Sequence, residues 1–253
     1  MSLQIATSGA GPPLALVHGW GLGRGVWQGV LPALEARFTV HRVSLPGYDG
    51  TADSAGDFGA LAGMLADALP ADAGLCGWSL GGMLALAAAA ARPGRFSRLV
   101  LVAATPRFLQ ADDWPAAQPA GDHEAFARAV AAAPAAALAR FVNLFNRGDA
   151  RSRDVIRALA PLRAAGPPPA CVLARGLAWL RDVDLRGVVP RVGTPTLVVH
   201  GEADPLMPVA VGEWLTQTLP AARLERVAGA AHAPFLSDPA RFVTAVTGFC
   251  APP

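Results

Sequence analysis

Short apolar runs rich in valine and leucine, and bounded by glycine or proline, recur along the chain. They lie at residues 14–17, 39–43, 74–76, 99–103, 196–199 and 224–227. Most are continuous rather than alternating, which is typical of strands buried on both faces of a parallel sheet. Helical patterns lie between several of them, at residues 26–36, 58–68 and 83–91. Strands alternating with helices predict an α/β fold with a mostly parallel central sheet and helices on both faces.

The strand pattern stops between residues 107 and 181, where alanine-rich helical stretches punctuated by prolines take over. This block follows the run 99–103, so it lies where a lid would cover the carboxyl ends of the strands. We therefore predict a core made of residues 1–106 and 182–253, interrupted by a helical cap at 107–181. The alternative is that these helices only complete the fold.

The composition is that of a globular chain with a large core, because 53% of its 253 residues are hydrophobic and 16% are charged. The longest apolar run, residues 83–91, falls well short of the roughly 20 residues that cross a bilayer. The first residues lack the basic and apolar regions of a secretory signal. We expect a cytoplasmic protein without membrane contact, and a monomer.

Charge and cysteine content exclude further classes. The formal net charge of +2 is too small to indicate a nucleic-acid partner, and every basic residue is an arginine. The three cysteines, Cys76, Cys171 and Cys250, show neither a disulfide pattern nor metal-ligand spacing. No disulfide framework and no metal site is expected.

The segment Gly77-Trp78-Ser79-Leu80-Gly81 lies between a predicted strand and a predicted helix. A GxSxG pattern in that context is typical of a nucleophile elbow, a strained turn that presents a serine hydroxyl above the end of the sheet. The start of the following helix favours developing negative charge. Ser79 is therefore the candidate nucleophile, and a chance match in a glycine-rich chain is the alternative.

A serine nucleophile needs a general base, and the base needs an acid that orients it. Asp204, in the loop after the run 196–199, is the candidate acid, and Glu202 is the alternative. His232, in the small-residue loop after the run 224–227, is the candidate base. The order serine, acid, histidine sharpens the prediction to an α/β-hydrolase fold.

Acyl transfer also needs two donors for the oxyanion. The elbow supplies the backbone N–H of Leu80, and the loop after the run 14–17 supplies that of Trp20, whose indole is expected in the wall of the acyl pocket. The remaining histidines are interpreted as structural. They are His18, His41, His123 and His200.

Six motifs occur in order along nearly the whole chain. They are His18-Gly19-Trp20-Gly21, Leu45-Pro46-Gly47-Tyr48, Gly77-Trp78-Ser79-Leu80-Gly81-Gly82, Asp113-Trp114-Pro115, Val183-Asp184-Leu185-Arg186 and Ala230-Ala231-His232-Ala233-Pro234-Phe235. Single motifs of this kind are widespread, but the combination resembles the pimeloyl-[acyl-carrier protein] methyl ester carboxylesterases of biotin synthesis.

The resemblance implies a cofactor-free serine esterase that releases methanol from a pimeloyl methyl ester held by acyl carrier protein. It also implies the substrate contacts. These are Trp20, Ser79, Leu80, Phe141, Val142, Asn143, Leu144, Phe145 and His232. Two sites differ from the family pattern. Around the second motif, Ser44 stands where relatives usually carry an aspartate, and Asp49 follows the aromatic Tyr48. In the cap, Phe145 and Asn146 change the polarity of the contact with the acyl chain.

The cap carries six arginines between residues 140 and 163, against two aspartates. Guanidinium groups bind carboxylate and phosphate well, so this surface suits an acidic carrier protein. Arg140, Arg153 and Arg157 best match basic positions of the family, and the alternative is a solvated helix face. On the same scaffold, a broad short-chain esterase or lactonase and a noncatalytic ligand-binding relative remain alternative functions.

Overall fold

The computed structural model describes residues 3–53 and 56–251 and contains one seven-stranded sheet. The strands are β1 (Gln4–Ser8), β2 (Pro13–Val17), β3 (Thr39–Ser44), β4 (Gly74–Trp78), β5 (Arg98–Val102), β6 (Thr196–Gly201) and β7 (Ala222–Val227). Their spatial order is β1-β3-β2-β4-β5-β6-β7. Neighbouring strands are parallel throughout, except that β1 pairs antiparallel with β3. The carboxyl ends of six strands therefore meet at one edge of the sheet.

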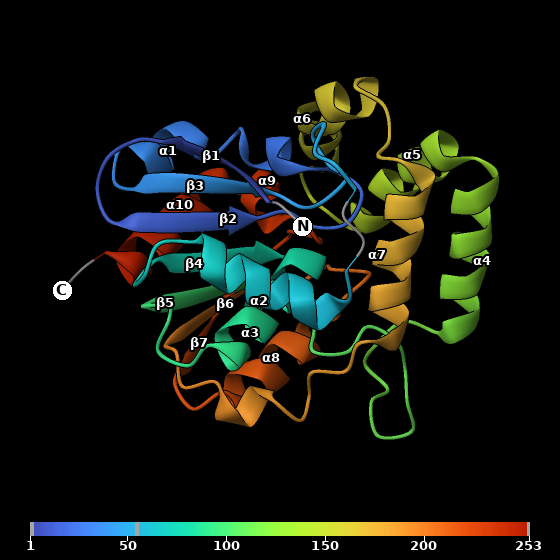
Figure 1. Ribbon diagram of the computed structural model, residues 1–253. Coiled ribbons are helices and arrows are strands. Elements are labelled where there is room, and N and C mark those ends of the chain that lie inside the picture. Colours follow the sequence, from blue (N-terminus) through green and yellow to red (C-terminus); the bar gives the residue numbers. More distant parts are fainter. Residues whose placement is uncertain (1–2, 54–55, 252–253) are drawn as a thin grey trace.

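Helices cover both faces of the sheet (Figure 1). In the sheet region they are η1 (Arg24–Trp27), α1 (Leu31–Glu35), α2 (Phe58–Ala68), α3 (Leu80–Ala91), η2 (Val189–Arg191), α8 (Val209–Thr218), α9 (Pro234–Ser237) and α10 (Pro239–Cys250). Helices α2, α3 and α8 lie on one face, and α1 and α10 on the other. This is the layered arrangement that the alternating pattern predicts.

Four further helices form a group beyond the end of the sheet (Figure 1). They are α4 (Ala120–Ala132), α5 (Pro134–Phe145), α6 (Ser152–Ala164) and α7 (Ala170–Asp182). They fall between β5 and β6 in the segment predicted to be a cap. That the segment is a separate lid stays a prediction.

The two ends of the cap segment lie side by side. Arg107 and Asp184 form an antiparallel bridge, and the Arg107 guanidinium donates to the Asp184 carboxylate at 2.8 Å. The backbone N–H of Leu185 donates to the Pro106 carbonyl, also at 2.8 Å. The chain thus leaves the sheet region and re-enters it at one place.

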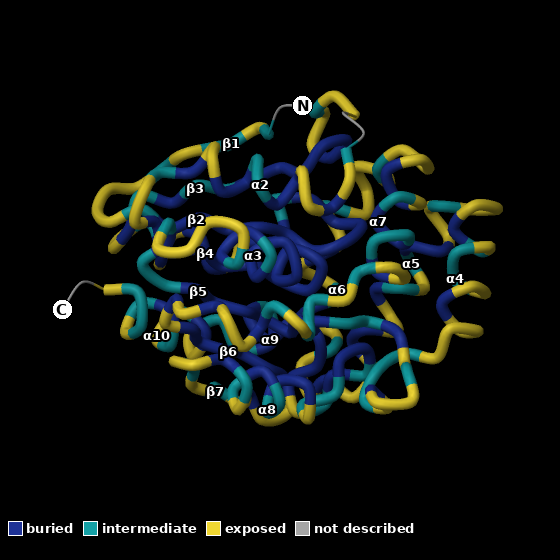
Figure 2. Tube along the Cα trace, turned by 60° about the horizontal axis from the view of Figure 1, so that its bottom comes forward, coloured by how far each residue is buried: buried dark blue, intermediate teal, exposed yellow. Residues whose placement is uncertain are grey.

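Burial follows the layers (Figure 2). Every residue of β4 and β6 is buried, whereas the edge strands β1 and β7 consist mostly of exposed and partly exposed positions. The continuous apolar runs in the sequence therefore mark the central strands, as expected for a sheet covered on both faces.

Two sequence predictions differ from the structure. The helix predicted at 26–36 is wrong, because a short 3₁₀ helix and α1 occupy this stretch separately. Gly29 lies in the break, and Pro32, which has no N–H to continue a preceding helix, stands in the first turn of α1. Strand β1 was not predicted, because its short polar and alternating sequence belongs to a half-exposed sheet edge.

No helix within residues 3–53 and 56–251 combines the length and apolar character that crossing a membrane would require.

Candidate active site

Ser79 lies at a sharp turn between β4 and α3, with a backbone φ of 56° and ψ of −121°. A positive φ is strained for any residue other than glycine, so the surrounding packing must hold it. The flanking glycines permit that packing. A Cβ at Gly77 would collide with the backbone of Gly81, and one at Gly81 would collide with the carbonyls at the end of β2. The sequence motif thus corresponds to a tight elbow.

The structure brings the three predicted residues together. The Ser79 hydroxyl lies 3.0 Å from Nε2 of His232, and Nδ1 of the same ring lies 2.8 Å from Oδ2 of Asp204. All three are buried, with 7%, 0% and 6% of their surfaces exposed. Since the carboxylate fixes the proton on Nδ1, Nε2 is left to accept the proton of the hydroxyl.

Backbone amides hold the carboxylate of Asp204. Its Oδ1 accepts from the N–H groups of Leu206 and Met207 at 2.9 and 3.0 Å, which leaves Oδ2 for His232. Glu202, the alternative acid, is exposed and makes no contact with the imidazole within the described residues. The geometry therefore favours Asp204 over Glu202.

His200 binds the loop that carries Asp204. Its Nε2–H donates to the Met207 carbonyl at 2.6 Å, and the same nitrogen lies 3.7 Å from Oδ2 of Asp204. Complete burial lowers the pKa of His200, an effect that exceeds the opposing attraction of the Asp204 charge. A neutral His200 lets the Asp204 charge act mainly on His232.

Aromatic side chains enclose His232. The Trp78 indole N–H donates to the His232 carbonyl at 2.7 Å, and the rings of Trp78 and Phe145 lie 5.6 and 5.8 Å from the imidazole. Phe235, in the short helix α9 that follows His232, also packs against Trp78. With this packing the imidazole is fully buried.

The two predicted oxyanion donors flank Ser79. Leu80 is the first residue of α3, so its N–H has no partner within the helix, and Trp20 follows directly after the Gly19 turn. A Cβ at Gly19 would lie 3.2 Å from that of Ser79, which shows how closely this loop approaches the elbow. That the two amides donate to an oxyanion formed at Ser79 stays a prediction.

His18 and Tyr48 hold the loop that carries Trp20. His18 donates from Nδ1 to the Gly19 carbonyl at 2.8 Å and accepts at Nε2 from the Leu45 N–H. The Tyr48 hydroxyl accepts from the N–H of Gly21 at 3.0 Å. Burial lowers the pKa of His18 and raises that of Tyr48 to about 12, so both side chains stay neutral at pH 7.

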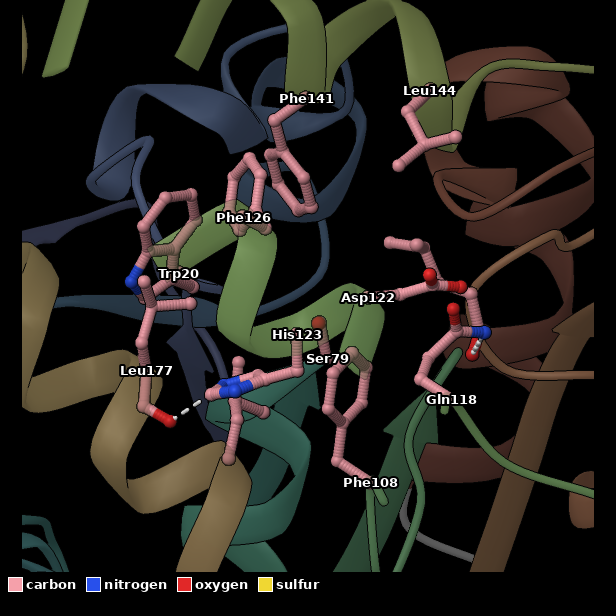
Figure 3. A pocket seen from close by; sticks show the side chains of 12 residues that line it. Trp20, Ser79, Phe108, Gln118, Asp122, His123, Phe126, Phe141, Leu144 and Leu177 are labelled. Atoms are coloured by element: carbon pink, nitrogen blue, oxygen red, sulfur yellow. Dashed lines mark hydrogen bonds between the residues drawn. The ribbon is translucent and has the colours of Figure 1, made fainter. Parts of the chain in front are cut away.

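A mostly apolar pocket opens above Ser79 (Figure 3). Its lining residues come from the loops after β2, β4 and β6, from the start of the cap segment and from the cap helices α4, α5 and α7. They are Trp20, Ser79, Phe108, Gln118, Asp122, His123, Phe126, Phe141, Leu144, Leu177, Leu180 and Leu206. The rings of Trp20, Phe126 and Phe141 lie 5.1 to 5.6 Å apart and form one wall.

Helix α5 divides the five cap residues that the resemblance implied. Phe141 and Leu144 line the pocket, while Val142 and Phe145 are fully buried behind it and do not line it. Asn143 lines a neighbouring groove on the outer surface. A run of five successive helical residues cannot face one pocket, because they spread around all sides of the helix.

Sequence reasoning missed eight of the twelve residues that line the pocket. Phe108, Phe126 and Leu177 are apolar side chains whose helical spacing does not separate a pocket face from a core face. His123 was assigned a structural role, and its Nε2–H does donate to the Leu177 carbonyl at 3.0 Å, yet the side chain also lines the pocket (Figure 3). Only knowledge of the helix packing could have identified them.

The predicted carrier contacts are exposed. Arg140 lines the outer groove together with Arg147, next to the pocket mouth, because Phe126, Phe141 and Leu144 border both hollows. Arg153 and Arg157 lie on α6, and Arg157 pairs with Asp154 at 3.1 Å. These guanidinium groups are available to a partner, since exposed ion pairs of this kind are weak.

Ser44 and Asp49, which depart from the family pattern, contact each other. The Ser44 hydroxyl donates to Oδ2 of Asp49 at 2.6 Å, and Arg24 donates to both residues. Asp49 has a φ of 52°, which an aspartate tolerates better than most side chains. The carboxylate missing at residue 44 is thus supplied from residue 49, away from Ser79 and its partners.

No three His, Cys, Asp or Glu side chains in residues 3–53 and 56–251 are grouped so that they could hold a metal ion. What the arrangement can do chemically is nucleophilic acyl substitution: an activated hydroxyl, two amides for the oxyanion and an apolar pocket for an acyl chain.

Comparison with known proteins agrees with this fold. A family model for the alpha/beta hydrolase fold matches residues 12–239. Among solved structures, an esterase (EaEST) from Exiguobacterium antarcticum superposes with a TM-score of 0.89 at 22% identity, covering 99% of this chain and 96% of that chain. At that identity the likeness concerns the fold alone.

Two curated relatives are much more similar in sequence. A protein of Nitrosomonas europaea named pimeloyl-[acyl-carrier protein] methyl ester esterase is 40% identical over 96% of this chain and 97% of its own length. A protein of the same name from Aromatoleum aromaticum is 42% identical over 90% of this chain and 94% of its own length.

Proposed function

This chain belongs to the pimeloyl-[acyl-carrier protein] methyl ester esterases of the α/β-hydrolase family, and on that premise we propose that it hydrolyses the methyl ester of a carrier-bound pimeloyl chain. The products are methanol and pimeloyl-[acyl-carrier protein], an intermediate of biotin synthesis. The observation that carries the proposal is Ser79, held 3.0 Å from a buried imidazole at the floor of an apolar pocket.

The first half of the reaction acylates the serine. As the Ser79 hydroxyl attacks the ester carbonyl, its proton passes to Nε2 of His232, and Asp204 stabilises the imidazolium that forms. The negative charge on the carbonyl oxygen is met by the N–H groups of Trp20 and Leu80. When the C–O bond to the methoxy group breaks, the imidazolium returns the proton to that oxygen and methanol leaves.

The second half releases the acid. Water gives a proton to Nε2 of His232 and adds to the acyl carbon, again with the oxyanion facing the amides of Trp20 and Leu80. Collapse of this adduct breaks the bond to Ser79, whose oxygen takes the proton back. The distal carboxyl group of the chain is then free, and no cofactor takes part in either half.

The pocket suits a chain of methylene groups. Phe126, Phe141, Leu177 and Leu180 provide apolar contact surface along it. Burying methylene groups there contributes about 0.8 kcal/mol each. This surface favours substrates with several carbons between the ester and the next polar group over acetate esters.

The cap surface suits a carrier protein. Arg140 lies beside the pocket mouth, and Arg153 and Arg157 follow on α6, so an acidic carrier could dock there while its acyl chain enters the pocket. The tetrad of Arg140, Arg147, Arg153 and Arg157 is exposed throughout. Docking through these side chains is part of the proposal.

The decisive experiment compares methyl pimeloyl-carrier protein with short p-nitrophenyl esters, using purified protein and methanol release or chromogenic product as the measurement. We expect a much larger kcat/KM for the carrier-bound ester. Turnover of the small esters alone would contradict the proposal and favour a broad short-chain esterase.

Complementation of a biotin auxotroph that lacks this esterase tests the same proposal in cells. The intact gene should restore growth without biotin, and the Ser79→Ala variant should not. Growth with both would mean that hydrolysis at Ser79 is not the complementing activity.

A further inference from the structure

Asp149 is a buried carboxylate that the proposed mechanism does not use. It lies in the turn between α5 and α6, with 8% of its surface exposed. Gly148 precedes it with a φ of +86°, a conformation that lets the turn reverse direction and aim the next side chain at the sheet region. An ionised carboxylate at such a position is costly unless it is fully hydrogen-bonded.

The two oxygens of Asp149 bind different parts of the molecule. Oδ1 accepts from the backbone N–H of Arg151 at 2.8 Å, at the start of α6. Oδ2 accepts from the N–H of Ala231 at 2.8 Å and from the hydroxyl of Ser237 at 2.5 Å. One carboxylate therefore joins a cap helix to the loop and short helix on either side of His232.

Two backbone hydrogen bonds reinforce the same junction. The N–H of Ala150 donates to the Gly229 carbonyl at 2.8 Å, and the N–H of His232 donates to the Phe145 carbonyl at 3.3 Å. The loop from Gly229 to His232 is thus hydrogen-bonded to the cap at both of its ends, and Asp149 binds Ala231 between them.

We infer that Asp149 is a positioning residue for the general base: it holds the Ala231 amide, and through it the His232 ring, in line with Ser79, and so couples the cap to the reaction. The inference rests on the proposed role of His232. Ala231 directly precedes His232 and is fully buried, so its amide has no access to water if the carboxylate is removed. A misplacement of about 1 Å at such a site can cost about a hundredfold in rate.

The Asp149 side chain must be a carboxylate because only hydrogen-bond donors face it. All three of its partners donate hydrogen bonds: two backbone amides and one hydroxyl. An asparagine has a single acceptor oxygen, so whichever way its amide turns, its NH₂ group meets one of the two backbone N–H donors. Asp149→Asn therefore disturbs one side of the junction at nearly constant volume.

The test measures kcat and KM separately on a short p-nitrophenyl ester, at a temperature well below the melting temperature of every variant. We expect Asp149→Asn to lower kcat between about 10-fold and 100-fold with KM changed less than twofold. Ser237→Ala, which removes one donor, should give a smaller loss of the same kind. The control is Asp154→Asn, an exposed carboxylate on α6, which should leave kcat and KM unchanged.

A spectroscopic measurement separates positioning from a general loss of stability. The proton shared by Nδ1 of His232 and Asp204 gives a far-downfield proton NMR signal, which Asp149→Asn should shift or broaden and Asp154→Asn should not. A lower melting temperature with unchanged kcat and an unchanged signal would overturn the inference, and so would a change confined to KM. Full activity of Ser79→Ala would instead remove the proposed function itself.

Discussion

The sheet edge that carries Ser79 and the cap helix α5 position their side chains by different means. At the edge, the backbone sets the positions. Ser79 has a positive φ between flanking glycines, and two backbone amides bind the carboxylate of Asp204. On α5, regular helix geometry divides neighbouring residues between core, pocket and solvent. Phe145 is fully buried, Phe141 lines the pocket, and Arg140 is exposed.

The difference indicates what each region controls. Hydrogen-bonded groups at the sheet edge act on the reacting atoms, so changes there should lower kcat. Apolar groups of α5 and charged groups on the exposed cap surface act on the substrate or on packing, so changes there should raise KM or lower stability. Asp149, in the turn after α5, acts through the loop of His232 and belongs with the sheet edge. Four sets of substitutions, in order of decreasing expected effect, test this division, and a change of pH tests the burial of two histidines.

The largest effect is expected from the nucleophile and the base. Ser79→Ala and His232→Ala should each lower kcat on the order of 10⁵- to 10⁶-fold, because the hydroxyl needs the imidazole as its base and the imidazole has no nucleophile to activate without the hydroxyl. The double variant should be little worse than either single one. Labelling by a fluorophosphonate should disappear in Ser79→Ala, and persistent turnover in either variant would refute the assignment.

The acid comes next. Asp204→Asn should lower kcat by about 10⁴-fold, since an amide no longer fixes the imidazole tautomer or stabilises its cation. Glu202→Gln is the matched control and should stay within about twofold, because Glu202 is exposed. Steady-state kinetics measure both, and a greater loss in Glu202→Gln would exchange the roles of the two residues.

A third substitution compares two faces of α5. Phe145→Ala removes a fully buried ring that packs against Trp78 and His232, so it should lower the free energy of unfolding by about 3–5 kcal/mol. Leu144→Ala, whose side chain lines the pocket and is 37% exposed, should cost less than about 1 kcal/mol and raise KM instead. Urea unfolding and kinetics measure the two effects, and equal destabilisation would contradict the division.

A smaller effect is expected at the cap surface. Reversing charge in an Arg153→Glu, Arg157→Glu double variant should raise KM for the carrier-bound ester about five- to tenfold, on the order of 1 kcal/mol. Hydrolysis of a short ester should not change. Arg128→Glu on α4 is the control, and parallel losses on both substrates would indicate misfolding rather than docking.

The last prediction concerns pH, which acts on stability rather than on kinetics. Burial lowers the pKa of His18 and His200 in the folded state. Between those lowered values and about 6.5 the unfolded chain binds protons that the folded chain does not, so stability should fall as pH drops below about 6.5. Each histidine contributes up to about 1.4 kcal/mol per pH unit in that interval.

Melting temperatures at pH 7.5 and 5.5 measure this loss. His200→Gln, whose amide can still donate to the Met207 carbonyl, should flatten the dependence. A melting temperature that rises on acidification would show that these histidines are not buried in their neutral form.

The sequence predicts best where local rules set the structure. The central strands and α2 were located closely, because continuous apolar runs and glycine boundaries depend only on neighbouring residues. The choice of Ser79, Asp204 and His232 followed from loops at predicted strand ends, and in the structure those loops do meet.

Tertiary packing decided the rest. Nothing in the spacing of α5 distinguishes Leu144 from Phe145, since both are apolar and adjacent, and only the neighbouring helices make one a pocket residue. Asp149 was counted only as a charge within a basic stretch, because its partners Ala231 and Ser237 lie more than 80 positions away.

The bridge between Arg107 and Asp184 has a consequence for how such enzymes diversify. Because the two ends of the segment between β5 and β6 lie side by side, a segment of different sequence could replace it without altering the path of the remaining chain. A recombinant carrying a foreign segment would inherit a new substrate wall from one donor. It would stay active only if the donor segment also matched the recipient at Ala231 and Ser237.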